Sequence, residues 1–122
     1  MIPVSGDIRV TPGIWTRQIL ANPEKTKTKF VDIAPETLSF GEMLDIYGEV
    51  TGRQVGYVQC SIGDYEKIWG PGGKELADQL VFGEQFEQGW GSEGGVPMAE
   101  LGIKPEEVPG FRKTIESLKD QL

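Results

Sequence analysis

The chain has 122 residues, enough for one domain with its own core, and carries 12 basic and 19 acidic side chains for a formal net charge of −7. Lys104 is the single basic residue between positions 75 and 107, and this acidic balance disfavours binding to nucleic acids, whose phosphates it would repel. No long apolar run or basic leader is visible, so no membrane span or signal peptide is expected, and the expected location is cytoplasmic.

The first helix signal is Thr11 followed by Pro12. Threonine is a favoured N-cap residue, and proline is tolerated in the first turn of a helix. The helix is expected to stop at Asn22, because the next residue is a second proline. A charged turn then leads to residues 30–34, whose β-rich composition predicts a strand.

The clearest helix start lies at Ser39. Ser39 and Glu42 have the spacing of a capping box, in which each side chain bonds the backbone N–H of the other residue. The apolar residues that follow fall on one helical face, and Gly52 is expected to end this helix. Residues 55–60 then predict a second strand.

Three further helices are expected towards the C-terminus. Ser61 and Asp64 repeat the capping pattern at the start of a short helix over residues 61–69. Residues 73–90 form the longest helical candidate, which is apolar on two sides and therefore needs a cover on both. A last amphipathic helix begins near Phe111.

These elements predict a small single α+β domain over residues 1–122. Four or five helices surround two or three short strands, without a complete Rossmann sheet. The sequence has no Gly-x-Gly-x-x-Gly after an apolar strand, the motif with which dinucleotide-binding folds hold a pyrophosphate, so no cofactor is expected. The single cysteine, Cys60, has no partner within the chain for a disulfide, and without histidine no zinc site is expected either.

A series of short segments runs through most of the chain. It comprises Ser5-Gly6-Asp7, residues 19–26, 29–34, 37–44 and 49–53, Tyr57-Val58-Gln59, Asp64-Tyr65-Glu66 and Leu101-Gly102-Ile103. In this order the segments resemble the NmrA-like family of atypical short-chain dehydrogenases/reductases. That family binds NAD(P) and includes fungal transcriptional regulators, redox sensors and reductases. The resemblance implies that this chain corresponds to the C-terminal, substrate-facing portion of the family's fold and lacks the N-terminal Rossmann half.

The departures from the family pattern concern its cofactor chemistry. In the family, the Rossmann half supplies the glycine loop and any reductase Tyr-x-x-x-Lys pair. Here none of Tyr47, Tyr57 and Tyr65 is followed by lysine four places on. The resemblance therefore implies a small-molecule-binding protein that acts without NAD(P).

The expected site is a pocket for an apolar ligand, walled by aromatic side chains. The candidate lining residues combine large apolar surfaces with one cation and are Trp15, Arg17, Tyr57, Trp69, Phe82, Phe86 and Trp90. The alternative is that most of the aromatic residues belong to the core or cover the footprint of a Rossmann half. For Arg17 the alternative is a surface salt bridge.

Candidate catalytic residues must work without histidine, so a carboxylate, tyrosine, lysine, cysteine or water would move any proton. The candidates are Asp64, Tyr65 and Asp32. The alternative for Asp64 is a helix cap shared with Ser61, and for Asp32 a position facing solvent or a partner. Cys60 is expected to be a packed thiol rather than a nucleophile.

Three functions stay open. The first is a non-redox isomerase, cyclase or dehydratase of fungal secondary metabolism, which would act by positioning its substrate. The second is a non-catalytic regulatory or binding module, and the third is a truncated fragment of an NAD(P)-dependent oxidoreductase or redox sensor. The expected partners are an apolar small molecule and a second copy of the chain, in a homodimer through the helix at 73–90 with the pocket at or beside its interface.

Overall fold

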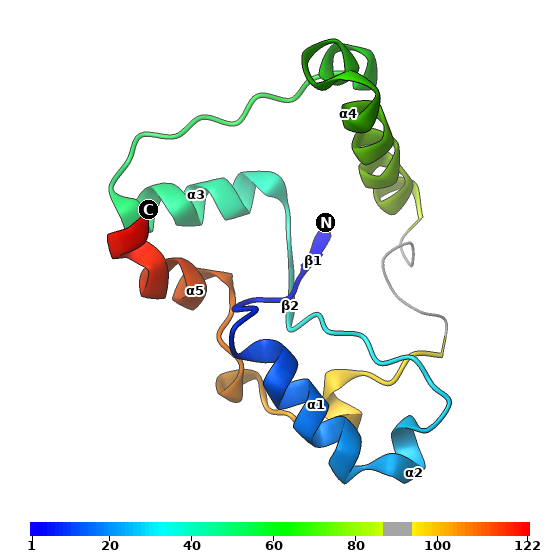
Figure 1. The fold of residues 1–122 in the computed structure, drawn as a ribbon. Helices are drawn as coiled ribbons and strands as arrows, with labels where there is room; N and C mark the ends of the chain where they lie inside the picture. Colours follow the sequence, from blue (N-terminus) through cyan, green and yellow to red (C-terminus); the bar gives the residue numbers. More distant parts are fainter. Residues whose placement is uncertain (87–93) are drawn as a thin grey trace.

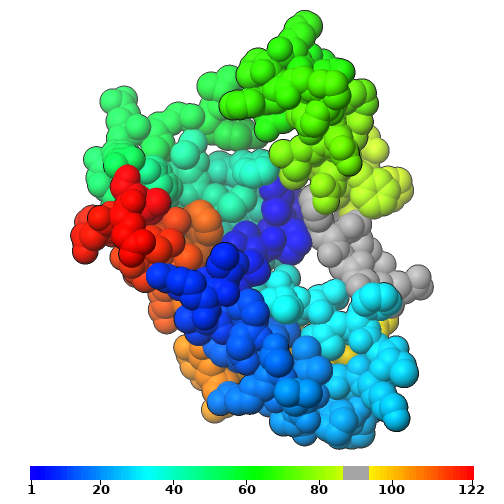
Figure 2. Space-filling view, in the orientation of Figure 1, coloured from blue at the N-terminus to red at the C-terminus, as the bar shows by residue number. Residues whose placement is uncertain are grey.

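The computed structural model describes residues 1–86 and 94–122. Its elements in chain order are β1 (Ile2–Val4), α1 (Thr11–Ala21), α2 (Pro23–Thr26), β2 (Glu36–Leu38), α3 (Phe40–Thr51), α4 (Ile62–Gln85), the short 3₁₀ helices η1 (Met98–Leu101) and η2 (Pro105–Glu107), α5 (Phe111–Leu118) and the 3₁₀ helix η3 (Lys119–Gln121). Figure 1 shows their arrangement, and Figure 2 shows α4 at one end of the molecule with α1 and α2 at the other. Five α-helices and one two-stranded sheet in the described ranges confirm the predicted α+β class.

The sheet is a single antiparallel pair in which β1 and β2 lie side by side, with Pro3 opposite Thr37. The predictions of strands at residues 30–34 and 55–60 are wrong. Within 30–34, Val31 forms only an isolated parallel bridge with Val96, and residues 55–60 have no regular structure. A strand is stable only when a neighbouring strand pairs with its backbone N–H and C=O groups, and among residues 1–86 and 94–122 neither segment has such a neighbour along its length.

The main core forms where α1 packs against the segment that carries η1 and η2 (Figure 1). Trp15 of α1 is fully buried, and its indole nitrogen donates a hydrogen bond of 3.0 Å to the backbone carbonyl of Asp32. The other buried apolar residues of this core are Val96, Leu101, Ile103 and Val108. This core holds the connection between α2 and β2 in place.

A second packed region joins α3 to α5. Arg112 of α5 forms an ion pair with Glu49 of α3. The carboxylate of Glu36, in β2, accepts a hydrogen bond from the backbone N–H of Phe111 at the start of α5. Residues from β2 and α3 therefore fix the position of the C-terminal helix.

The boundaries of α3 follow its expected signals. The Ser39 hydroxyl accepts a hydrogen bond from the backbone N–H of Glu42 at 3.2 Å, and the Glu42 carboxylate accepts one from the backbone N–H of Ser39 at 2.7 Å. This is the predicted capping box. Gly52 ends the helix in the left-handed conformation, with φ of 72°, which glycine adopts without a steric cost.

The start of α1 differs by one residue from the expectation. Thr11 is the first helical residue, Val10 occupies the N-cap position, and no side chain caps the helix. The helix ends as predicted, with Asn22 at its C-cap. The charged turn expected next is a four-residue helix, α2.

One long helix, α4, takes the place of the two expected at 61–69 and 73–90. Its first turn has the predicted cap, since the Ser61 hydroxyl accepts a hydrogen bond from the backbone N–H of Asp64 at 3.1 Å. A kink divides the helix at Gly70, where φ is 72° and ψ is −164°, and Pro71 follows. The helix ends at Gln85, with Phe86 at its C-cap in an extended conformation, and residues 87–90 of the expected helix lie outside the described residues.

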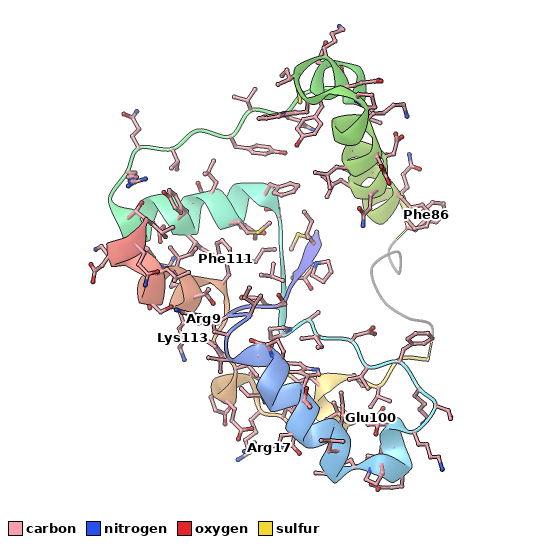
Figure 3. The ribbon with its side chains drawn as sticks, viewed as in Figure 1. Arg9, Arg17, Phe86, Glu100, Phe111 and Lys113 are labelled. Carbon is pink, nitrogen blue, oxygen red and sulfur yellow. The ribbon has the colours of Figure 1, made fainter. Side chains whose placement is uncertain are left out.

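An ion pair fixes the turn between β1 and α1. The Arg9 guanidinium donates to both carboxylate oxygens of Asp7, at 2.9 and 2.6 Å, and to the hydroxyl of Ser117 on α5 at 2.8 Å. Figure 3 shows where Arg9 lies in the fold. The hydrogen bond from the Arg9 side chain is the main reason why the pKa of Asp7 is lowered to about 2. Arg9 thus links the N-terminal turn to the last helix.

Candidate functional site

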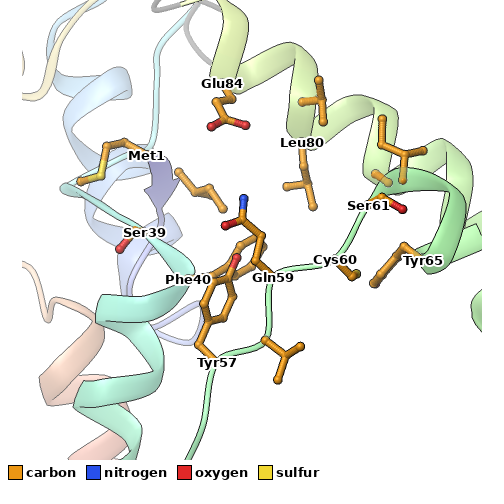
Figure 4. A pocket seen from close by; sticks show the side chains of 15 residues that line it. Met1, Ser39, Phe40, Tyr57, Gln59, Cys60, Ser61, Tyr65, Leu80 and Glu84 are labelled. Carbon is orange, nitrogen blue, oxygen red and sulfur yellow. The ribbon is translucent and has the colours of Figure 1, made fainter.

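A pocket with a volume of about 470 Å³ lies between α4, the extended segment 57–61 and the first residues of β1 and α3 (Figure 4). Most of its wall is apolar. The apolar side chains come from five places in the chain: Met1 and Ile2, Phe40, Tyr57 and Val58, Ile62 in the first turn of α4, and the later face of α4 that carries Ala77, Leu80 and Val81. A site of this volume is within the range that holds a small organic molecule.

Helical spacing explains which side of α4 faces the pocket. Ala77, Leu80, Val81 and Glu84 recur at intervals of three, four and seven residues, which places them on one side of the helix. Ser61 caps the N-terminus of the same helix and also borders the pocket. The cap that fixes the first residue of α4 is therefore itself part of the pocket wall.

A few polar groups interrupt the apolar wall. Figure 4 shows the Gln59 side chain and the Glu84 carboxylate directed into the space between the segment 57–61 and α4. Tyr57 and Tyr65 add phenolic hydroxyls. An apolar wall with a small number of separate hydrogen-bonding groups can orient a ligand whose body is apolar.

Two of the sequence-predicted site residues lie in this pocket. Tyr57, expected to line the pocket, and Tyr65, expected to be catalytic, both do so. Asp64 precedes Tyr65 but does not line the pocket. Its carboxylate accepts hydrogen bonds from Lys67 at 2.8 Å and from Ser61 at 2.7 Å, and these two bonds, the one from Lys67 first, lower the pKa of Asp64. The structure places Asp64 in the helix cap that was its alternative role.

The α1 end of the molecule holds three more of the predicted site residues. Trp15 is buried in the core, and the backbone of Asp32 bonds its indole. Arg17 is exposed on α1. None of the three lines the pocket, because the chain places α1 and the segment before β2 away from its walls.

The remaining aromatic candidates belong to α4 or to the residues after it. Trp69, Phe82 and Phe86 are exposed and do not line the pocket. Phe82 lies on the side of α4 away from Ala77 and Val81, and Phe86 follows the last helical residue. The Trp69 ring lies 6.3 Å from that of Tyr65, centroid to centroid. Trp90 lies outside the described residues.

Sequence reasoning did not single out Gln59 or Glu84. A signal for Glu84 was present, since it follows Leu80 by four residues and so interrupts an apolar helical stripe with a carboxylate. The thiol of Cys60 was expected to be packed, but it is exposed and borders the pocket. The cause is that residues 55–60 run as an open segment instead of joining a sheet.

In comparisons with known proteins, no family model, curated protein or solved structure matches this chain. Across residues 1–86 and 94–122, every helix is too short or too polar to cross a membrane. The same residues contain no group of three or more His, Cys, Asp and Glu side chains that could hold a metal ion. The pocket at α4 is the feature on which a functional proposal can be based.

Proposed function

We propose that this protein binds an apolar small molecule in the pocket between α3 and α4 and acts without NAD(P). The observation that carries the proposal is the composition of the wall, in which Gln59, Glu84 and the two tyrosines are set among apolar side chains. Such a wall favours a ligand with an apolar body and one or two polar groups. A net charge of −7 disfavours an anionic ligand such as a nucleotide.

The proposed family is the NmrA-like one, of which the chain would represent the substrate-facing portion. Tyr57 and Tyr65 belong to segments that carry the resemblance, and both border the pocket. Within this proposal the protein is cytoplasmic, serves fungal secondary metabolism, and forms a homodimer through α4. A regulatory module, or a fragment of an NAD(P)-dependent parent, would use the same pocket for binding alone.

The candidate reaction is a non-redox isomerisation, cyclisation or dehydration. Tyr65 and Glu84 favour it, because a phenolic hydroxyl that can donate a proton and a carboxylate that can accept one border the same pocket. Glu84 would remove a proton from a carbon next to a carbonyl group, and Tyr65 would supply one to the carbonyl oxygen. This exchange moves protons only and needs no electron acceptor. The pair replaces Asp64 and Asp32 in the roles first considered for them.

Fluorescence titration with Nile red, an uncharged apolar dye, tests the binding proposal. We expect Leu80→Asn, which adds a polar group to the wall, to weaken dye binding about 10-fold. The matched control is Leu20→Asn, the same substitution at an exposed residue of α1, which should leave the titration unchanged. Equal titrations for the protein and both variants would contradict the proposed site.

Proton exchange tests the reaction. An apolar cyclic ketone is incubated with the protein in D₂O, and NMR follows the exchange of the protons next to its carbonyl group. Glu84→Gln and Tyr65→Phe should each slow this exchange by about 100-fold or more if the two groups transfer the protons. If the Nile red titration is unchanged in these variants and exchange never exceeds the rate in buffer, the protein binds without catalysing.

A further inference from the structure

Glu84 brings a single charge to the pocket. Among the described residues that line the pocket, Glu84 has the only acidic or basic side chain. Figure 4 shows its carboxylate directed into the pocket from α4. Within residues 1–86 and 94–122, no other side chain forms an ion pair or a hydrogen bond with this carboxylate. The pocket therefore presents a negative charge that the described part of the chain does not neutralise.

The two lysines of α4 are paired with other carboxylates. Lys67 forms an ion pair of 2.8 Å with Asp64, and Lys74 forms one with Asp78. Each pair joins side chains three or four residues apart, which are neighbours on the surface of a helix. The helix that carries Glu84 thus uses its own cations elsewhere.

Met1 borders the pocket, but its amino group acts on the carboxylate of Glu42. Hydrogen bonds from Ser39 are the main reason why the pKa of Glu42 is lowered, and the charge of the amino group lowers it further. In the sequence, Lys104 is the single basic residue between positions 75 and 107. A protein with a net charge of −7 also attracts cations as a whole. The electrostatics of the pocket therefore favour a positively charged ligand.

Aromatic rings line the pocket together with this carboxylate. Phe40 of α3 is 44% exposed and Tyr57 is 56% exposed, so part of each ring is open to a ligand. Figure 4 shows both rings across the pocket from Glu84. The face of an aromatic ring attracts a positively charged nitrogen, and proteins recognise organic ammonium groups in this way.

We infer that the ligand of this pocket is an organic cation, an apolar molecule that carries one positively charged nitrogen. The inference rests on the proposed function and specifies its ligand. Glu84 would bind the nitrogen, and the Phe40 and Tyr57 rings would pack on its carbon substituents. A metal ion such as Ca²⁺ or Mg²⁺ fits this wall poorly, because it takes about six or more oxygen ligands and most of the wall is apolar.

Binding of this kind gives Glu84 a role different from that of a base. A carboxylate that is paired with a charged nitrogen orients the ligand and does not need to remove a proton from it. The proton-exchange experiment uses an uncharged ketone, so its outcome does not decide the nature of a charged ligand. The inference depends only on the binding part of the proposed function.

Ligand-detected NMR with two molecules of the same shape tests the inference. Benzyltrimethylammonium carries a positive charge, and neopentylbenzene has a carbon atom in place of the nitrogen. The equivalent methyl protons of each molecule give one strong line, and its broadening reports binding to the full chain. The two titrations therefore differ only in the charge of the ligand.

Glu84→Gln should weaken the binding of benzyltrimethylammonium about 5-fold and that of neopentylbenzene less than about 2-fold, because only the cation loses its counter-ion. The matched control is Glu75→Gln, the same substitution at an exposed residue of α4 that does not line the pocket. It makes the same change in net charge and should leave both affinities unchanged. Tyr57→Leu removes a ring but keeps an apolar side chain, and it should weaken the cation about 3-fold more than the neutral molecule.

Binding of neopentylbenzene without binding of benzyltrimethylammonium would overturn the inference and leave the proposed apolar site intact. Equal losses of cation binding in Glu84→Gln and Glu75→Gln would overturn it too, because the attraction would then come from the net charge alone. If Nile red and both molecules fail to bind, the proposed function is contradicted together with the inference. Both glutamates are exposed, so their variants should keep the circular dichroism spectrum of the unchanged protein.

Discussion

The indole nitrogen of Trp15 donates a hydrogen bond to the backbone carbonyl of Asp32, 3.0 Å away, from a side chain with no exposed surface. Trp15→Phe would keep most of the aromatic volume but leave this carbonyl without its donor. We expect the free energy of unfolding to fall by about 1–3 kcal/mol in urea denaturation. Trp69→Phe, the same change at an exposed residue, should alter it by less than about 0.5 kcal/mol. Equal effects at the two positions would refute this role for Trp15.

The kink of α4 should require glycine at position 70. Gly70 has φ of 72° and ψ of −164°, a conformation that almost only glycine adopts. Gly70→Ala should lower the free energy of unfolding by about 1–3 kcal/mol. Gly72→Ala, two residues later, should leave it unchanged or raise it by about 0.5–1 kcal/mol. An added Cβ meets nothing within 4 Å at either glycine, so urea denaturation of the pair isolates the backbone conformation. Similar stabilities would show that the kink does not need glycine.

Acid should lower the stability of the folded protein by protonating the Asp7 carboxylate. Its pKa is lowered from 3.8 to about 2, chiefly by the Arg9 side chain, so the carboxylate stabilises the folded state above the pKa of the unfolded chain. This contribution is complete above about pH 5 and is lost as the pH falls towards about 2. Asp7→Asn should therefore have a lower urea midpoint at neutral pH, with the difference closing between about pH 4 and about pH 2. A difference that stays constant with pH would rule out the ion pair as its cause.

The capping box of α3 should respond to the type of residue at position 39. Ser39→Ala removes the acceptor for the backbone N–H of Glu42 and should cost about 1 kcal/mol of unfolding free energy. Ser39→Asn replaces it with another strong N-cap residue and should cost much less. Thermal denaturation followed by circular dichroism at 222 nm, a wavelength chosen for helix content, measures both. If Ser39→Asn lowered the free energy of unfolding as much as Ser39→Ala, capping by the side chain at position 39 would not be what stabilises α3.

The helices could be predicted because their signals lie within a few residues of each other. Ser39, Glu42 and Gly52 mark both ends of α3 without reference to any other part of the chain. The strands could not, because β1 and β2 have three residues each, too few for an alternating pattern, and pair across more than thirty positions. Pro3 within β1 also argues against a strand, although an edge strand tolerates it.

The pocket was predictable in kind but not in its full set of residues. Tyr57 and Tyr65 are aromatic residues with a polar end, which suits a ligand site, and both were expected there. The periodicity of α4 separates Leu80 from Phe82 but does not say which of the two sides meets the segment 57–61. Trp15 shows the same limit, because an aromatic side chain suits a core and a pocket equally well, and only long-range contacts decide between them.

The contact between Glu36 and Phe111 also sets an order of events during folding. An isolated helix of eight residues is not stable, and α5 obtains its first hydrogen-bond acceptor from a residue 75 positions earlier. An added Cβ on Gly110 would come within 2.8 Å of the same carboxylate, so glycine leaves the space through which the two segments meet. We expect closure of this loop to precede α5 and therefore expect α5 to form late. Until that step is complete, the side of α3 that α5 covers stays open to non-native association in a newly made chain.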